Sequence, residues 1–409
     1  MVSTRPSDDC AGGDVRDVAV NGRTERWVPD VVPDNFPSNN LRIAILAGVR
    51  FATTEPHAGG LERHTDTLAR ELSRAGHRVT VFAGSRNELT EERLPYSIEP
   101  LVATRYEASN AARSDVSMPP DRFMIEHDAY LDVLSRLEGF DVVHNNSLNY
   151  LPVITPSSVP VVHTLHTPPT PWLESGYRIR DDRRSMSPAF DNSRVVSVSH
   201  ANARQWRHHV DLVVHNGVEL SRWRVGSGRG GYGVWSGRIV PEKGLHLALD
   251  AAERAGLELR VAGPIHDRGY FDEMVAPRLD RAVGAEYLGH LNIEELARLT
   301  ADAAVAVITP CWEEPFGLVA AEALACGTPV AAFHCGALGE IVSPDVGSLA
   351  PSGNVDALAN AVSDAISASR LACRRRAVER FSADVMALAY IHVYRSLTDP
   401  IRRTMAVSA

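Results

Sequence analysis

The stretch AAVAVITPCWEEPFGLVAAEALACGTPVAAFHCG, residues 303–336, decides the fold. Its two ends, AAVAVITP and TPVAAFHCG, are apolar runs of strand length. Between them FGLVAAEALA is a helical pattern that stops at Gly327 and Pro329. A strand, a helix and a second strand in this order predict one unit of a parallel sheet. Glu314 then lies just before the helix N-terminus, and Glu322 lies inside the helix.

The same alternation extends in both directions from this unit. Short β-rich runs occupy residues 42–48, 77–84, 141–146, 159–166, 193–200 and 211–217, and after the Gly-rich segment 226–233 they resume at 232–240, 257–264, 285–291, 303–310 and 328–336. Amphipathic helical patterns separate them, which is typical of parallel sheets covered on both faces. We predict an α/β fold of two Rossmann-like, doubly wound domains facing a cleft. The expected parts are a disordered leader (1–40), a first domain (41–215), a second domain (216–382), and a final helix and tail (383–409) that cross back to the first domain.

Composition excludes several classes of protein. The 409 residues include 42 Lys and Arg against 51 Asp and Glu, a formal net charge of −9, which argues against nucleic acid as a partner. No run approaches the ~18 apolar residues that span a bilayer, and the N-terminal residues lack the apolar core of a secretory signal. The sequence therefore predicts a cytoplasmic protein without integral membrane association, and it does not indicate an oligomeric state.

The expected helix start after residue 310 is a candidate anion site. The N–H groups of Phe316, Gly317, Leu318 and Val319 are unsatisfied donors at the carboxyl end of a strand, where a phosphate fits. The ionised carboxylate of Glu322 among alanines is costly unless hydroxyl groups or a cation satisfy it. Two ordinary interpretations stay open: Glu322 caps or pairs with a neighbour, and Glu314 is a common N-terminal helix carboxylate.

Two cations follow an earlier strand, in SGRIVPEKGLHLAL at residues 236–249. Arg238 comes at the expected strand end, and Lys243 opens the next expected helix. A lysine at a helix start opposes the helix dipole unless an anion is bound. Together they could grip phosphate oxygens, whereas for either residue alone a solvated surface cation is the ordinary interpretation.

In the first domain, Gly59 and Gly60 open a helix at a strand end, and glycine lets a phosphate or sugar approach the backbone closely. A glycine pair is also common in plain turns. His163 and His166 end the strand at 159–166, and one of them could face the cleft, the alternative being a structural role for both.

Some motifs are absent from the sequence. It has no Asp-x-Asp triplet to bridge a divalent metal to a diphosphate, so we expect no metal site and expect Arg, Lys and helix N–H groups to hold the diphosphate. It also lacks the Gly-Lys-Ser/Thr phosphate loop, and the spacing Gly-x-Gly-x-x-Gly occurs only in the Gly-rich segment 226–233, ahead of a strand and not between a strand and the following helix as the dinucleotide fingerprint requires. Redox and nucleotide-hydrolysing functions lose support.

With these residues in place, the chain resembles a retaining glycosyltransferase of family four, which has the two-Rossmann GT-B fold. The resemblance runs from about residue 41 to 397 and rests on the Gly59–Gly60 helix start, the segment NGVE at 216–219, the pair Arg238 and Lys243, the segment LGHLNIEELARL, and the Glu-x7-Glu element from Glu314 to Glu322. One departure is Glu219, where many relatives have Asp.

The resemblance implies transfer of a hexose or amino-hexose from a nucleotide-diphosphate sugar, a UDP-sugar above all, to a hydroxyl of a small acceptor. The transfer would retain the configuration of the anomeric carbon and would need neither a metal nor a cofactor. The acceptor would belong to secondary-metabolite or small-saccharide synthesis. The first domain would take the acceptor and the second the donor. The implied roles are Glu322 on the ribose, Arg238 and Lys243 on the diphosphate, Glu314 with the 316–318 backbone on the donor sugar, residues 288–291 including Leu291 near the base, the Gly60 N–H on the distal phosphate, and His166 beside the sugar or acceptor.

Two other functions stay open. One is a nucleotide-sugar epimerase or a phosphorylase on the same fold, and the other is a non-catalytic nucleotide-sugar-binding partner. The acceptor pocket is expected to involve the connection at residues 106–123 and the Arg-rich segment 176–184. The arginines of that segment, Arg178, Arg180, Arg183 and Arg184, either contact an anionic acceptor or form a solvated charged stretch.

Overall fold

The computed structural model describes residues 19–20, 23–24, 40–55, 57, 59–84, 94–101, 120–184, 192–281 and 284–398, with no side-chain description for 19–20, 23–24 and 120–125. The expected disordered leader lies outside these residues, apart from Asn40 and the short antiparallel pair β1 (Ala19–Val20) and β2 (Arg23–Thr24). Most of the expected acceptor connection at 106–123, namely residues 106–119, also lies outside them.

The first domain is built on a seven-stranded parallel sheet in the order β5-β4-β3-β6-β7-β8-β9. Its strands are β3 (Arg42–Leu46), β4 (Arg78–Ala83), β5 (Ser97–Pro100), β6 (Val142–Asn145), β7 (Val161–Leu165), β8 (Ser193–Ser197) and β9 (Leu212–Val213). Its helices are α1 (Gly60–Arg74), α3 (Pro120–Leu134), α4 (Leu151–Ile154), α5 (Pro171–Arg184), α7 (His200–Trp206) and the turn η2 (Arg207–His209).

The second domain has a six-stranded parallel sheet in the order β12-β11-β10-β13-β14-β15. Its strands are β10 (Tyr232–Ser236), β11 (Glu258–Ala262), β12 (Ala285–Tyr287), β13 (Val305–Ile308), β14 (Val330–Phe333) and β15 (Gly347–Ala350). Its helices are α8 (Leu245–Ala255), α9 (Arg268–Tyr270), α10 (Ala276–Arg281), α11 (Ile293–Asp302), α12 (Leu318–Ala325), α13 (Leu338–Ile341), α14 (Val355–Ala365) and α15 (Arg370–Arg380), with the 3₁₀ helix η3 (Pro241–Lys243) and the π-helix η4 (Phe271–Val275).

The predicted α/β class with two doubly wound domains is confirmed. In each sheet the first long strand is central, because β3 lies between β4 and β6, and β10 lies between β11 and β13. This order creates a switch point beside each central strand, where ligands of open parallel sheets bind. Each of the eleven expected apolar runs contains a strand. The sequence prediction missed β5 and β15, which are four-residue strands at sheet edges with little apolar pattern.

The chain crosses between the domains twice, and the two crossings are hydrogen-bonded to each other. The Val218 N–H donates to the Phe381 carbonyl at 2.8 Å, and the Ala383 N–H donates to the Val218 carbonyl at 3.0 Å. Gly217 packs so closely here that an added Cβ would lie 2.6 Å from the Cα of Ala383. This paired crossing joins the domains.

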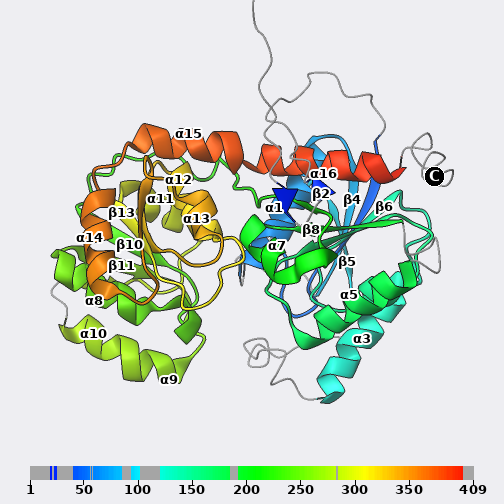
Figure 1. The fold of residues 1–409 in the computed structure, drawn as a ribbon, viewed down its shortest axis with the longest axis horizontal. Helices are drawn as coiled ribbons and strands as arrows, with labels where there is room; N and C mark the ends of the chain where they lie inside the picture. The colour runs from blue at the N-terminus through cyan, green and yellow to red at the C-terminus, as the bar shows by residue number, and fades with distance from the viewer. Residues whose placement is uncertain are drawn as a thin grey trace, which may run out of the picture.

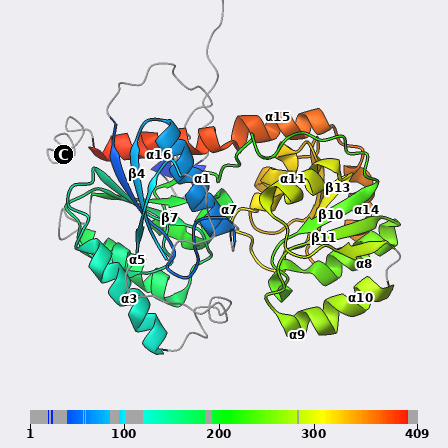
Figure 2. The same cartoon turned by 180° about the vertical axis from the view of Figure 1, so that it is seen from behind.

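As predicted, the last helix returns to the first domain. Figures 1 and 2 show α15 and α16 (Ala383–Thr398) following one another along the same side of both domains. Met386, Tyr390 and Tyr394 of α16 are buried in one core with Ile43 and Leu68 of the first domain. The C-terminal helix is therefore part of the first domain's packing.

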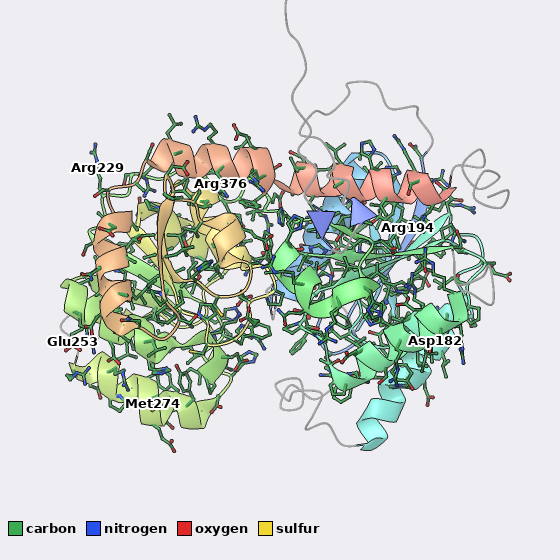
Figure 3. The ribbon with its side chains drawn as sticks, in the orientation of Figure 1. Asp182, Arg194, Arg229, Glu253, Met274 and Arg376 are labelled. Atoms are coloured by element: carbon green, nitrogen blue, oxygen red, sulfur yellow. The ribbon has the colours of Figure 1, made fainter. Side chains whose placement is uncertain are left out.

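Arginines of α15 tie the second domain together. Arg376, labelled in Figure 3, donates to the carbonyls of Ile341 at 2.6 Å and Glu340 at 2.9 Å. These bonds satisfy carbonyls at the end of α13. Among the described residues, no helix has the length and apolar character needed to span a membrane.

Candidate active site

Loops from three strand ends carry the predicted site residues. Arg238 and Lys243 follow β10, Glu314 precedes α12 after β13, and Gly59 precedes α1 after β3. All three strands are central in their sheets, and parallel strands end at the same sheet edge. The topology thus places the predicted residues at the switch points of both domains.

Lys243 and Glu314 are in direct contact. The Lys243 Nζ lies 2.6 Å from Glu314 Oε2, and the same oxygen accepts a hydrogen bond from Trp312 Nε1 at 3.1 Å. The ammonium also lies 5.1 Å from the centre of the Trp312 ring. The prediction that Lys243 opens a helix is wrong in detail, because Lys243 ends η3 and Gly244 precedes α8. The contacts hold both charges at the sheet edge with little freedom to move.

Lys243 is also the only lysine in the sequence, against 41 arginines among the 42 basic residues. The composition alone carries this signal. An ammonium is a compact point charge, whereas a guanidinium is a wide planar fork. At this position the compact ammonium lies between the Glu314 carboxylate and the Trp312 ring.

The start of α12 offers free backbone donors. Gly317 precedes the helix with φ +97°, a conformation that favours glycine, and Phe316 before it is buried. The Gly317 carbonyl accepts from Ala320, but within the described chain the N–H groups of Leu318 and Val319 have no acceptor. These groups carry the partial positive charge of a helix N-terminus. The arrangement fits an oxygen anion beside Glu314.

The first turns of α1 and α12 face each other across the domains. A Cβ added to Gly60 would lie 3.3 Å from the Leu318 Cδ1. Behind this contact lies Glu62, which is buried, and its burial raises its pKa although its own N–H, His57, Arg238 and the Gly59 N–H act against the shift. Arg238 of the second domain is therefore near a carboxylate of the first. Among the described residues Arg238 has no hydrogen-bond partner.

Glu322 pairs with an arginine of the other domain. Its side chain is only 2% exposed, and Arg63 of α1 donates to Oε1. Arg63 also lies 5.9 Å from the centre of the Trp223 ring. Both charged groups line a cavity between the domains, together with Trp223, Ile293 and Leu318. Of the two interpretations of Glu322, the structure thus shows the pairing with a neighbour: Arg63 lies where the resemblance places the ribose.

The structure separates the two candidate histidines. His163 is 2% exposed and bonds the Asn145 side chain at 3.1 Å inside the first domain. His166 is half-buried after the end of β7, and its ring lies 4.6 Å from that of His64, which lines the cavity. Burial and the nearby His64 and His144 lower the pKa of His166 well below its usual value. Of the pair, His166 lies on the cavity side.

Leu291 and the arginine segment are less closely tied to this site. Leu291 is half-buried in the loop after β12, two residues before the cavity-lining Ile293. Arg180 is 1% exposed and bonds Ser193 and Asp181, and Arg183 and Arg184 contact the Ile154 carbonyl and Asp211 respectively. Arg180 is therefore a buried structural residue that fits neither interpretation, whereas Arg178 and Arg183 are exposed, as the solvated-stretch interpretation expects.

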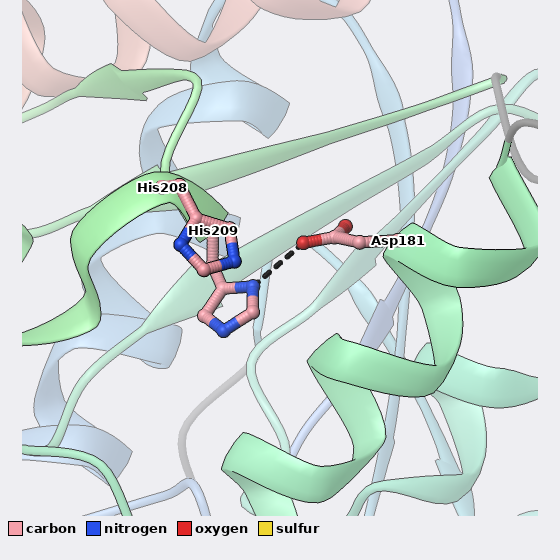
Figure 4. A group of neighbouring side chains, drawn as sticks. All are labelled: Asp181, His208 and His209. Carbon is pink, nitrogen blue, oxygen red and sulfur yellow. Dashed lines mark hydrogen bonds and ion pairs between the residues drawn. The ribbon is translucent and has the colours of Figure 1, made fainter. Parts of the chain in front are cut away.

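Three clusters of carboxylates and imidazoles lie outside the predicted site residues, although His57 and Asp66 of one cluster line the same cavity. Among the described residues, three groups are close enough to share a metal ion: Asp181 with His208 and His209, His200 with His215 and Glu340, and Glu55 with His57 and Asp66. Figure 4 shows the first group, in which His209 Nδ1 lies 2.6 Å from Asp181 Oδ2. None of the three groups contains Glu314 or Glu322.

Two family models match the chain. The model described as Glycosyltransferase Family 4 matches residues 58–222, and the model described as Glycosyl transferases group 1 matches residues 231–380. The chain belongs to glycosyltransferase family 4. The resemblance seen in the sequence is confirmed at the level of family, GT-B fold and enzyme class.

Relatives of this glycosyltransferase have several activities. It is 27% identical to a MMP alpha-(1->4)-mannosyltransferase of Mycolicibacterium hassiacum, with 87% of this chain and 98% of the relative covered. It is 28% identical to a D-inositol 3-phosphate glycosyltransferase of Mycobacterium avium, with 78% and 84% covered. It is 34% identical to a glycogen synthase of Mycobacterium tuberculosis over 44% of this chain, and it spans about half, 47%, of that relative's length.

Solved structures share the fold. Sucrose-phosphate synthase from Thermosynechococcus elongatus has a TM-score of 0.70 at 20% identity, covering 88% of this chain and 99% of that one. HepE from Anabaena, in complex with UDP and glucose, has a TM-score of 0.64 at 18% identity, covering 87% and 100%.

Proposed function

We propose that this glycosyltransferase moves a hexose or amino-hexose from a UDP-sugar to a hydroxyl of a small acceptor, with retention at the anomeric carbon and without a divalent metal. The observation that carries the proposal is the convergence of Lys243 and the free Leu318 and Val319 amides at one edge, opposite Gly60 of the other domain. The HepE structure, which holds UDP and glucose, supports a UDP-sugar donor, and the D-inositol 3-phosphate glycosyltransferase supports a small hydroxylated acceptor.

In this proposal the site stabilises the leaving group. When the anomeric C–O bond breaks, negative charge develops on the diphosphate, next to Lys243, Arg238 and the α12 amides. Groups already in place for that charge lower the barrier without reorganisation. The acceptor oxygen bonds to the anomeric carbon on the face that the diphosphate leaves, and its proton passes to the leaving phosphate oxygen. Glu314, held by Lys243 and Trp312, is placed to accept from sugar hydroxyls.

Substitution of the two cations tests the diphosphate assignment. Lys243→Ala and Arg238→Ala are each expected to reduce product formation by about 10²-fold, the scale of losing one preorganised donor to a transition-state charge. Arg254→Ala is the matched control, because Arg254 lies on exposed α8 surface with Asp356. Mass spectrometry of products from a panel of UDP-hexoses and acceptors measures transfer. Activity within a few-fold of wild type in both site variants would refute the assignment.

The single lysine allows a second test without mutation. An amine-acylating reagent can modify two amines of this chain: the Lys243 side chain and the α-amino group. UDP is expected to protect Lys243 from acylation, as read by peptide mass spectrometry, and the α-amino group serves as the internal reference. Equal labelling with and without saturating UDP would contradict phosphate binding at Lys243. Repeating the transfer assay in excess EDTA tests metal independence, and lost activity that Mg²⁺ restores would overturn that part.

Acceptor dependence separates the other functions. Donor turnover without any acceptor would indicate an epimerase, turnover that requires free phosphate would indicate a phosphorylase, and UDP binding with no turnover on any acceptor would indicate a non-catalytic partner.

A further inference from the structure

A chain of buried polar groups leads from the C-terminal helix to His166. Tyr394 of α16 contacts His144 Nδ1 through its hydroxyl at 2.5 Å, and His144 Nε2 lies 2.9 Å from Asn146 Oδ1. The same Asn146 oxygen lies 2.8 Å from His166 Nε2. Tyr394, His144 and Asn146 are all fully buried, so water does not complete their hydrogen bonds.

One end of this chain fixes the orientation of the Asn146 amide. The Thr65 hydroxyl donates its only proton to the Leu61 carbonyl at 2.9 Å. Its oxygen can then only accept from Asn146, at 3.3 Å. The amide therefore points its NH₂ group at Thr65 and its carbonyl oxygen at the two histidines. A carbonyl oxygen accepts but does not donate, so both histidine Nε2 atoms must carry protons.

The Tyr394 end of these hydrogen-bonded groups requires the same proton positions. Within the described chain, the buried Tyr394 hydroxyl has one partner, His144 Nδ1. A buried hydroxyl that does not donate loses a hydrogen bond, so Nδ1 of His144 accepts and its Nε2 carries the proton. His144 is neutral, because burial above all lowers its pKa to about 3. Two independent ends thus give one proton arrangement.

We propose that Asn146 is a positioning residue that holds His166 as the neutral Nε2–H tautomer, with the Nδ1 lone pair available to a hydroxyl of the donor sugar or the acceptor. His166 is half-buried, and its Nδ1 has no partner among the residues that the structure describes. In this state His166 accepts a hydrogen bond and orients a hydroxyl. The role toward sugar rests on the proposed function, whereas the tautomer does not.

The tautomer can be measured directly. Long-range ¹H–¹⁵N correlation spectra of the full chain with ¹⁵N-labelled histidine distinguish a protonated from a bare ring nitrogen, and the His166→Gln variant assigns the signals. The expected result near pH 7.5 is protonated Nε2 and bare Nδ1 for His166. A proton on Nδ1, or on both nitrogens, would overturn the proposal. Because the measurement needs no turnover, it stands apart from failure of the proposed function, which would appear as a protein without transferase activity.

A kinetic comparison tests the positioning role. Asn146→Leu removes the acceptor and is expected to lower kcat by about tenfold, the effect of about one hydrogen bond, while the affinity for UDP is retained. Asn145→Leu is the matched control, because this neighbouring buried asparagine bonds His163 instead. Equal loss of kcat in both variants would show a merely structural effect and overturn the role.

Asn146→Asp separates charge from hydrogen bonding. A carboxylate keeps two acceptor sites for the histidines but favours the imidazolium, so it raises the pKa of His166. Protonated Nδ1 no longer accepts a hydrogen bond, so kcat/KM of the Asn146→Asp variant is expected to fall at low pH, where the wild type shows no such fall. At high pH its activity is expected to exceed that of Asn146→Leu. The absence of both effects would contradict the proposal.

Discussion

Arg63→Met tests whether the first domain competes with the nucleotide for Glu322. Methionine keeps an apolar side chain beside Trp223 but removes the cation that pairs with the 2%-exposed Glu322. Breaking a fully buried pair costs about 3–5 kcal/mol, but the Arg63 side chain is 24% exposed, which reduces the expected cost to about 1–2 kcal/mol. We expect the free energy of unfolding to fall by that amount.

The same change is expected to strengthen UDP binding. If ribose hydroxyls replace Arg63 on Glu322, UDP no longer has to break the pair, and about 1–2 kcal/mol corresponds to about five- to thirtyfold tighter binding by calorimetry. A UDP analogue that lacks both ribose hydroxyls should not gain. Arg222→Met is the control, since Arg222 lines the same cavity but pairs with Glu55. Unchanged or weaker UDP binding in Arg63→Met would refute the placement of the ribose.

Two further predictions concern stability. Gly217→Ala places a Cβ 2.6 Å from the Cα of Ala383, and by opening the paired crossing it should lower the free energy of unfolding, measured by chemical denaturation, by about 1–3 kcal/mol. Gly269→Ala is the control: its added Cβ has its nearest atom at 3.5 Å, so the change should stay within about 0.5 kcal/mol. Equal effects of the two substitutions would contradict the close contact at Gly217. Burial lowers the pKa of His64 and His144 to about 3, so below about pH 6.5 the unfolded chain binds protons that the folded chain does not, and the unfolding free energy should fall by about 1.4 kcal/mol per histidine per pH unit. The loss should shrink in His144→Gln, and an unchanged pH slope would contradict it.

The sequence was sufficient for the fold and for the location of the candidate site. Apolar runs buried on both sheet faces give a strong local pattern, so β3 and β13 were predictable. That Lys243 and Glu314 lie at one edge of the sheet was predictable because strand ends in parallel sheets meet there. Their mutual contact was not, because it depends on side-chain packing around Trp312.

Cross-domain partners could not be predicted in the same way. Arg63 and Glu322 are 259 positions apart, and no local pattern states that two helix starts face each other. The proton arrangement around Asn146 was equally hidden, because Thr65 and Tyr394 come from opposite ends of the chain. Their sequence signal is only a polar residue inside an apolar pattern, which is also compatible with an ordinary surface position.

The return of α16 to the first domain imposes an order on biosynthesis. Tyr390 and Tyr394 complete a core that includes Ile43, so the ribosome must synthesise residues 383–398 before the first domain can close its core. Domains usually mature in the order of their synthesis. Here the first domain is synthesised before the second, but its core is completed after it. Nascent chains that stop before residue 383 would carry an exposed apolar surface on which chaperones and proteases can act.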